Sequence, residues 1–461
     1  EEILELDRYC RERFVELVPN QNTFGHMERW LHRPRYEHLA ENMPGMPIQY
    51  YLCPSDPRSL QLVEELLDEL LPHFTSRQAM VGLDEVRLGA GGRSAALCEE
   101  RGSPEQVYLD YLKAVHRIVR RHGRTMMYFA DMVVQHDLVS QVPGDAVGLI
   151  WGYDEEYPFR EHCARYADAG IPFYPVPGTC CHTSIGGRTG LAMRNMAAAV
   201  ASALEFGGSG TLVANWGDGG HWQPLTVTMV GYAYGAGVMW GLHGNRDADL
   251  AAALDAHLYQ DEAQVTGRVS VDLGRACQQL PALADWTAYQ TILQQKPGGH
   301  EELARIEPRE LEGAGEFVAR TLEPLGRASM GCSDAGIVAG ELRVAAGLMR
   351  HACHLALTRF QAVGTRLPDL PEGWGISHIL PENRTPAERA AERCYYWPER
   401  PGDAEIPTYG SDRLRPLADE MEQVLADYRR TWLARNRPGG LDESAARFDR
   451  LLQLYRQGMQ G

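Results

Sequence analysis

Residues 79–85 read AMVGLDE, a short apolar run that ends in two adjacent acids. Such a run is typical of a strand that is buried on both faces of a parallel sheet. Comparable runs occur at residues 15–19, 125–129, 146–151, 172–176 and 211–216. The sequence therefore predicts six short parallel strands, with the two acids at the carboxyl end of the second one.

Stretches with the apolar spacing of helices lie between these strands, at residues 59–74, 104–122, 159–169 and 191–206. Alternating strands and helices indicate an α/β fold, and we expect a (β/α)8-type TIM barrel. A closed barrel needs two more strands, which would lie upstream of Glu1, and the lack of an initiator Met fits a barrel that is incomplete at its N-terminus. An open doubly wound sheet also fits, but no glycine-rich phosphate loop follows the first strand.

The second half of the chain has a different pattern. Strand signals fade after about residue 246, and helical runs follow at residues 309–325, 335–362, 411–433 and 441–457, with a proline-rich stretch at 367–408. We therefore expect a barrel domain over residues 1–245 and a mainly helical C-terminal domain over residues 246–461.

Composition excludes several classes of partner. The formal charge of −17 argues against nucleic acid and against an anionic membrane. The ten cysteines are scattered without a CxxC pair, so neither a zinc site nor a disulfide framework is expected. No stretch is long and apolar enough to span a bilayer, and no signal peptide is visible, so we expect a cytoplasmic location. Since the N-terminus is expected to lie upstream, secretion stays open, as does a homo-oligomer.

Polar and aromatic residues gather at the carboxyl ends of the predicted strands, where barrels carry their catalytic groups. Carbohydrate sites need this mixture, because rings stack on the apolar faces of sugars while acids and amides bind hydroxyls. The candidate site residues are Asn22, His26, Asp84, Glu85, Asp131, Trp151, Tyr153, His182, Trp216, Asp218 and Trp222.

Asp84 and Glu85 are the sharpest candidates for catalysis. Where a strand loses its regularity, two neighbouring carboxylates can reach one pocket, and each then raises the proton affinity of the other. One of them would stay protonated near neutral pH and serve as a general acid. The alternative, an ordinary exposed acid pair in a loop, stays open.

Residues 215–222 read NWGDGGHW, in which three glycines allow a tight loop lined by two tryptophans and one acid. We expect part of a ligand pocket here; the alternative is a turn stabilised by Asp218, with Trp222 in the core. Residues 151–154, WGYD, fit either a binding role or an aromatic packing corner. The histidines at 26, 182 and 221 lack the spacing of a metal site, so hydrogen-bonding roles are expected for them.

Several motifs, in their order along the chain, resemble bacterial relatives of glycoside hydrolase family 20, the β-N-acetylhexosaminidases. They are residues 17–30 (LVPNQNTFGHMERW), 81–85 (VGLDE), 151–153 (WGY), 177–179 (PGT), 184–189 (SIGGRT), 216–224 (WGDGGHWQP) and 432–441 (WLARNRPGGL). Each motif is modest alone, and their order is the specific part. The resemblance covers most of the predicted barrel and touches the C-terminal tail.

The resemblance implies release of terminal β-linked N-acetylhexosamine from a glycan by a substrate-assisted retaining mechanism, without a metal or organic cofactor. Glu85 would protonate the glycosidic oxygen and later activate water, and Asp84 would orient the 2-acetamido group of the substrate. Asp218 would bind a hydroxyl, and the walls of the sugar pocket would be Trp151, Trp216 and Trp222.

The sequence also departs from the family's pattern. A substrate-binding Arg expected near the first strand is missing, Phe129 and Ala130 stand where a Trp is expected, and His182 stands where another Trp is expected. These departures keep two alternatives open. One is a non-catalytic carbohydrate-binding relative that has lost activity. The other is a glycosidase with two ordinary carboxylates, in which Asp131 or Asp218 partners Glu85.

Overall fold

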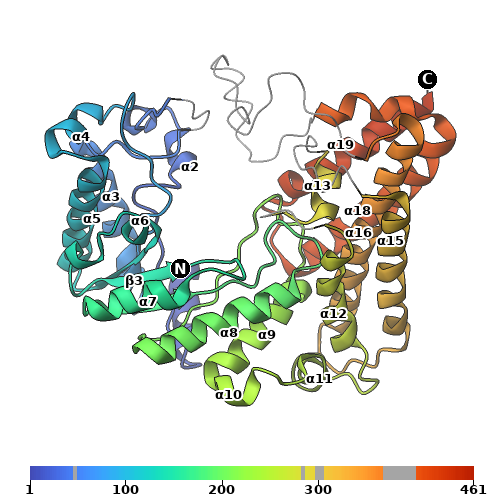
Figure 1. Ribbon diagram of the computed structural model, residues 1–461, viewed down its shortest axis with the longest axis horizontal. Coiled ribbons are helices and arrows are strands. Elements are labelled where there is room, and N and C mark those ends of the chain that lie inside the picture. Colours follow the sequence, from blue (N-terminus) through green and yellow to red (C-terminus); the bar gives the residue numbers. More distant parts are fainter. Residues whose placement is uncertain (45–48, 282–285, 296–305, 367–400, 461) are drawn as a thin grey trace.

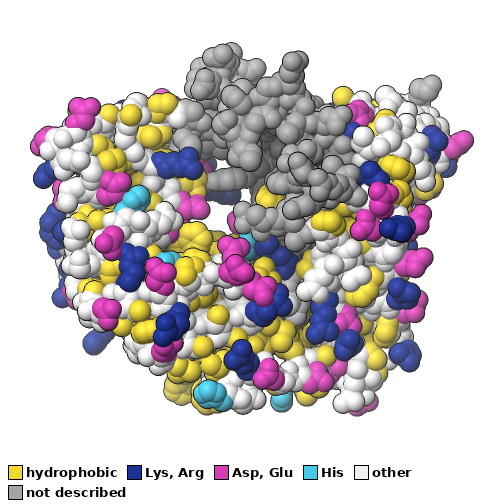
Figure 2. All heavy atoms as spheres, viewed as in Figure 1, with side chains coloured by type: hydrophobic (Ala, Val, Ile, Leu, Met, Phe, Trp, Pro, Cys, Tyr) yellow, Lys and Arg dark blue, Asp and Glu magenta, His cyan; other side chains and the backbone are white. Residues whose placement is uncertain are grey.

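The computed structural model describes residues 1–44, 49–281, 286–295, 306–366 and 401–460. Figure 1 shows an α/β lobe that contains α3 to α7 and a helical lobe that contains α12 to α19, with α8 and α9 running between them. On the face seen in Figure 2 the molecule is hollowed between the lobes, and basic side chains are interspersed with acidic ones. No helix of the described residues is long and apolar enough to cross a membrane.

The sheet has four parallel strands in chain order, which are β1 (Gln78–Met80), β2 (Thr125–Phe129), β3 (Val147–Trp151) and β4 (Phe173–Val176). A parallel bridge between Asn20 and Met80 adds the first predicted strand at one edge, and a parallel bridge between Gly178 and Ala214 adds the last at the other. All six predicted runs therefore lie in one parallel array. An eight-stranded barrel stays a prediction.

The two faces of the sheet alternate residue by residue, as the pleat of a strand requires. Along β1 and β2, Ala79 and Met126 pack in the core beneath the helices, whereas Met80 and Met127 belong to a separate cluster on the opposite face. Trp151 packs against that second cluster. The candidate residues Trp151 and Tyr153 therefore pack on the face opposite to the helices.

Helices cover the first face at the places where the sequence predicts them. Asp56 caps α3 by accepting the Arg58 N–H, and Ser103 caps α5 by accepting the Gln106 N–H; each cap is followed by proline, which suits a first helical turn. The helices of the first half of the chain are α1 (Glu2–Arg11), α2 (Glu28–Leu31), α3 (Pro57–Leu70), α4 (Ala95–Arg101), α5 (Pro104–Arg121), α6 (Asp131–Gln135), α7 (Phe159–Asp168) and α8 (Thr189–Phe206).

Long helices form the second half, and the four runs predicted there are confirmed as α15, α16, α18 and α19. The α-helices described there are α9 (Leu225–Trp240), α10 (Leu242–Asn245), α11 (Leu250–Ala253), α12 (Thr266–Arg275), α13 (Ala288–Gln294), α15 (Pro308–Leu322), α16 (Ala335–Val363), α18 (Ser411–Arg435) and α19 (Leu441–Gln460). Most of the predicted proline-rich stretch, residues 367–400, lies outside the described residues.

One continuous apolar core joins the helical half to the end of the α/β half. It runs from Cys180 to Tyr455 and includes side chains of α8, α9, α12, α13, α15, α16, α18 and α19. Packing therefore crosses residue 245, and the domain boundary placed there stays a prediction.

Candidate active site

The acid pair lies just beyond β1, in a loop whose backbone is left-handed at three positions. Gly82, Leu83 and Glu85 have φ values of 69°, 74° and 52°. Glycine adopts such angles without cost, whereas the other residue types are strained there. A Cβ at Gly82 would lie 2.5 Å from Oδ1 of Asn22. The predicted site residue Asn22 therefore packs directly against this loop.

His26 brings the two acids together. Its Nε2 lies 3.2 Å from Oδ2 of Asp84 and 3.4 Å from Oε2 of Glu85. The Tyr50 hydroxyl contacts Nδ1 of the same ring. Burial disfavours the charged imidazole, but the hydrogen bonds and charges of the two acids outweigh it and raise the pKa of His26 to about 10. The site therefore carries one imidazolium between two carboxylates.

The expectation that Asp84 and Glu85 raise each other's proton affinity is wrong for Glu85. The hydrogen bond from His26 lowers the pKa of Glu85, and this effect exceeds the opposing effect of burial. Two neighbouring acids alone form a like-charge pair, but in the fold the imidazolium of His26 contacts both of them. The two side chains also differ in exposure, because that of Asp84 is 10% exposed and that of Glu85 is 53% exposed.

Asp131 supplies a third carboxylate, at the end of β2. Its Oδ2 accepts the backbone N–H of Glu85 at 2.9 Å, and its Oδ1 accepts the indole N–H of Trp151 at 3.3 Å. Burial raises the pKa of Asp131 to about 6, despite these hydrogen bonds. The sequence placed Asp131 among the strand-end acids but contained no signal for its link to Glu85. Nor did it point to Tyr50, which lies in a loop without a motif.

An aromatic group continues from Trp151 across the strand ends. The rings of Trp151 and Tyr153 are stacked with centroids 5.4 Å apart, and Tyr153 meets His182 edge-on at 5.5 Å. The Trp216 indole N–H donates to the Tyr153 hydroxyl at 2.7 Å. The structure thus unites four predicted site residues from three different strand ends.

His182 is held by Arg188 as well as by this aromatic contact. Nη2 of Arg188 lies 3.0 Å from Nε2 of His182 and donates to the His182 carbonyl at 3.0 Å. Burial and the nearby guanidinium lower the pKa of His182 to about 3. His182 is therefore neutral at physiological pH, and its Nε2 accepts a hydrogen bond.

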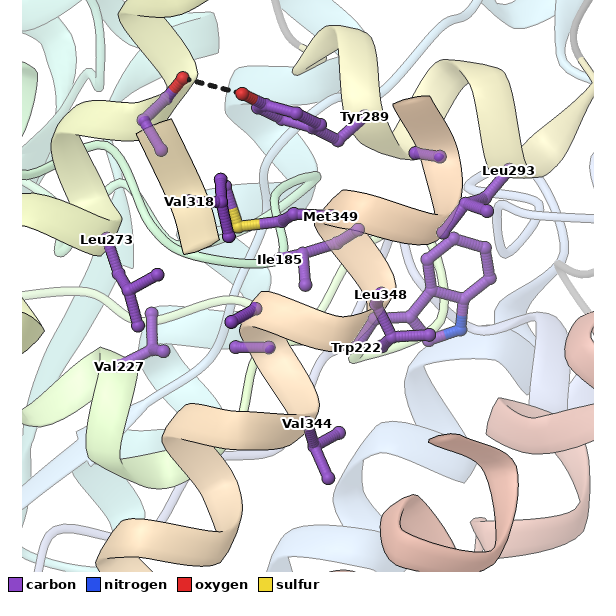
Figure 3. Close-up of a cluster of buried hydrophobic side chains, with 14 of the residues drawn as sticks. Ile185, Trp222, Val227, Leu273, Tyr289, Leu293, Val318, Val344, Leu348 and Met349 are labelled. Atoms are coloured by element: carbon purple, nitrogen blue, oxygen red, sulfur yellow. Dashed lines mark hydrogen bonds between the residues drawn. The ribbon is translucent and has the colours of Figure 1, made fainter. Parts of the chain in front are cut away.

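Trp222 requires a correction, because it does not wall a pocket. Its side chain is 1% exposed and lies in the core beside Leu348 of α16 (Figure 3). The indole N–H donates to the Ser444 carbonyl, and the ring packs on Phe448 at 4.5 Å. The alternative considered for this loop, Trp222 in the core, is the arrangement observed. Asp218 is exposed in the same loop, and its carbonyl accepts the Thr183 N–H.

Comparison with known proteins finds relatives for the α/β half. Residues 1–175 match the family model of the glycosyl hydrolase family 20 catalytic domain. Human Hexosaminidase D is 33% identical over 150 residues, which are 30% of this chain and 30% of the human protein. Bovine Hexosaminidase D is 32% identical over 150 residues, which are 30% of this chain and 42% of the bovine protein. The chain thus spans less than half the length of these two relatives.

Among solved structures, a β-N-acetylhexosaminidase from Bacteroides fragilis is similar with a TM-score of 0.31 and 18% identity, covering 40% of this chain and 36% of that one. The family match covers β1 to β3 and most of β4, together with His26, Asp84, Glu85, Asp131, Trp151 and Tyr153. Residues 1–175 are therefore similar to the catalytic domain of glycosyl hydrolase family 20.

Proposed function

We propose that this protein releases terminal β-linked N-acetylhexosamine from a glycan by a substrate-assisted retaining mechanism. One observation carries the proposal: neighbouring carboxylates, Asp84 and Glu85, meet at one imidazole beside a group of aromatic rings. We further propose that the parallel array is part of a TIM barrel, with the helical domain beginning near residue 246.

Asp84 suits the role of orienting the 2-acetamido group. Its Oδ2 is engaged by His26, whereas its buried Oδ1 has no hydrogen-bond partner among the described residues. A buried carboxylate oxygen without a donor is costly, and an amide N–H of the substrate would satisfy it. The negative charge of Asp84 would also stabilise the positive charge that develops on the acetamido group during attack.

Glu85 suits the role of general acid and base. Its side chain is 53% exposed, so a leaving-group oxygen can reach it. In its protonated form, Glu85 passes its proton to the glycosidic oxygen as the bond from that oxygen to the anomeric carbon breaks, and the aglycone leaves with this proton. The acetamido oxygen forms the new bond to that carbon. Water then attacks the anomeric carbon and opens the five-membered ring that the acetamido oxygen had closed. Glu85 takes the proton from this water and is protonated again.

Aromatic rings next to the acids supply the sugar-binding surface. Trp151, Tyr153 and Trp216 are linked by stacking and by one hydrogen bond. Stacked rings are rigid and offer apolar faces to the C–H side of a pyranose, which adds affinity at little entropic cost. Trp216 is 38% exposed and is therefore available for this contact.

Release of a chromogenic aglycone from a β-N-acetylglucosaminide or galactosaminide tests the proposal. Glu85→Gln should lower kcat about 10²- to 10⁴-fold, the usual contribution of general acid–base catalysis, and Asp84→Asn should remove much of the activity. Glu65→Gln, an exposed acid on α3, serves as the matched control and should leave kcat unchanged. Turnover that survives both site substitutions would rule the mechanism out.

A second candidate function is sugar binding without hydrolysis. It is favoured by the lowered pKa of Glu85, because a carboxylate that stays ionised cannot donate a proton. Calorimetry with N-acetylglucosamine separates the two candidates. Binding together with a complete lack of aglycone release by the wild-type protein would select the non-catalytic function.

A further inference from the structure

We propose that the C-terminal helices α13, α18 and α19 position the loop of residues 216–222, and that Gln290 and Ser444 are positioning residues of the sugar site. The inference rests on the proposed function, because it assigns the helical half a part in the same site. It concerns a loop beyond the residues that match the family model.

Consecutive carbonyl groups of the loop are bound by side chains of the helices. The Gly219 carbonyl accepts from Nε2 of Gln290 at 2.8 Å and from Nε2 of Gln294 at 3.2 Å, one helical turn apart on α13. The Gly220 carbonyl accepts from the Ser444 hydroxyl on α19 at 2.6 Å. The His221 carbonyl accepts from the Tyr428 hydroxyl on α18 at 3.5 Å.

The loop backbone presents these carbonyls because three residues in a row are left-handed. Gly219, Gly220 and His221 have φ values of 75°, 116° and 53°. A Cβ at Gly219 would lie 2.5 Å from Nε2 of Gln290, so the backbone and the helix approach each other closely. The strained conformation at His221 costs free energy, and bonds from outside the loop are needed to offset it.

The buried end of the loop is anchored in the helical core, and its other end reaches the aromatic group. Trp222 donates to the Ser444 carbonyl at 3.0 Å, while Ser444 donates to the loop, so the two contacts are reciprocal. Gln290 is 0% exposed. At the opposite end, Trp216 is exposed and donates to the Tyr153 hydroxyl. The position of the helices therefore determines where the Trp216 ring stands.

Neither Gln290 nor Ser444 contacts the acid pair in the described structure. Their substitution should therefore weaken sugar binding and leave the rate of the chemical step unchanged. Removing one neutral hydrogen bond to the loop corresponds to about a three- to tenfold effect on an equilibrium. Gln290→Met and Ser444→Ala should each raise KM by about that factor, with kcat within about twofold of the wild type. The affinity for N-acetylglucosamine should fall by the same factor in calorimetry.

Tyr289→Phe is the matched control. It removes a buried hydrogen bond of the same helix, α13, and the acceptor of that bond lies outside the loop. The Tyr289 hydroxyl donates to the Ala276 carbonyl at 3.0 Å (Figure 3). This variant should keep the wild-type KM. Hydrogen–deuterium exchange of residues 217–221 should be faster in Gln290→Met and Ser444→Ala than in Tyr289→Phe.

Unchanged exchange of residues 217–221 in both loop variants would overturn the inference, as would an equal rise of KM in Tyr289→Phe. A wild-type protein that binds no N-acetylglucosamine would overturn the proposed function together with the sugar-site role of these residues. The exchange comparison needs no substrate. Faster exchange in Gln290→Met and Ser444→Ala would therefore still show that the helices hold the loop, even if the protein had no activity.

Discussion

The Asp131 carboxylate accepts the backbone N–H of Glu85 at 2.9 Å, across 46 residues of sequence. Its other oxygen accepts the Trp151 indole. One buried side chain therefore fixes both the backbone of the proposed general acid and a ring of the proposed sugar-binding surface.

Asp131→Ala should lower kcat/KM and destabilise the fold, because it leaves the N–H groups of Glu85 and Trp151 without an acceptor. Each buried donor left unpaired costs about 1–3 kcal/mol. Asp131→Asn keeps one acceptor oxygen, so it should lose less stability and less activity than Asp131→Ala. Urea unfolding and steady-state kinetics of the two variants check that the loss is larger in Asp131→Ala than in Asp131→Asn. Equal effects of Ala and Asn would contradict the proposed contacts.

The raised pKa of Asp131 should be visible in how the free energy of unfolding depends on pH. Its folded pKa of about 6 lies above its ordinary value of 3.8, so the folded state binds the proton more tightly. The resulting stabilisation is complete below about pH 3.8 and is lost as pH rises through about 6. Asp131→Asn cannot titrate. The free energy of unfolding of the wild type, measured relative to that of Asp131→Asn, should therefore fall between about pH 4 and pH 6.

The contribution of His26 to stability should depend on pH in a higher range than that of Asp131. Its folded pKa of about 10 lies above the ordinary value of 6.5, so its stabilisation is fully present below about pH 6.5 and is lost as pH rises through about 10. His26→Gln should be less stable than the wild type by about 1.5–3 kcal/mol near pH 6.5, the range for hydrogen bonds to charged groups. Denaturant titrations at pH 6.5, 8.5 and 10 should show the difference shrinking. A constant difference would argue against a charged His26.

Gly82→Ala should destabilise the protein by about 1–2 kcal/mol, because the left-handed conformation is unfavourable for alanine and the new Cβ would press on Asn22. Activity should fall as well, since Gly82 sets the path of the chain into Asp84. Gly170→Ala is a suitable control, because φ is 66° there but no atom lies within 4 Å of a new Cβ. Thermal unfolding compares the two, and a larger loss in Gly170→Ala would contradict the crowding argument.

Trp222 and Trp216 should respond in opposite ways to substitution. Trp222→Ala removes a ring that is 1% exposed and should cost about 3–5 kcal/mol of stability. Trp216→Ala removes a ring that is 38% exposed and should change stability little while it raises KM. Chemical denaturation and steady-state kinetics on both variants separate the core role from the binding role. A stable Trp222→Ala variant with a raised KM would restore the pocket role predicted from sequence.

Local sequence patterns were sufficient for the strand runs, for the helices between them and for the four long helices α15, α16, α18 and α19, but not for α9, α12 and α13. A strand buried on two faces and a capped amphipathic helix each leave a signature in a few consecutive residues, so the runs at 79–83 and 104–122 could be predicted. The same holds for the placement of Asp84 and Glu85 at a strand end. Of the helices that were not predicted, α13 is short and lies between stretches outside the described residues.

What the sequence by itself determined is the parallel strands of the first half, the long helices of the second half, and the place of the acid pair at a strand end. Tertiary structure alone decided that His26 is the cation at that pair, that Asp131 holds Glu85, and that Trp222 belongs to the core. The physical reason is that protonation and burial depend on groups brought close in space from other elements. Spacing along one chain records the periodicity of a helix or strand and carries no comparable trace of those contacts.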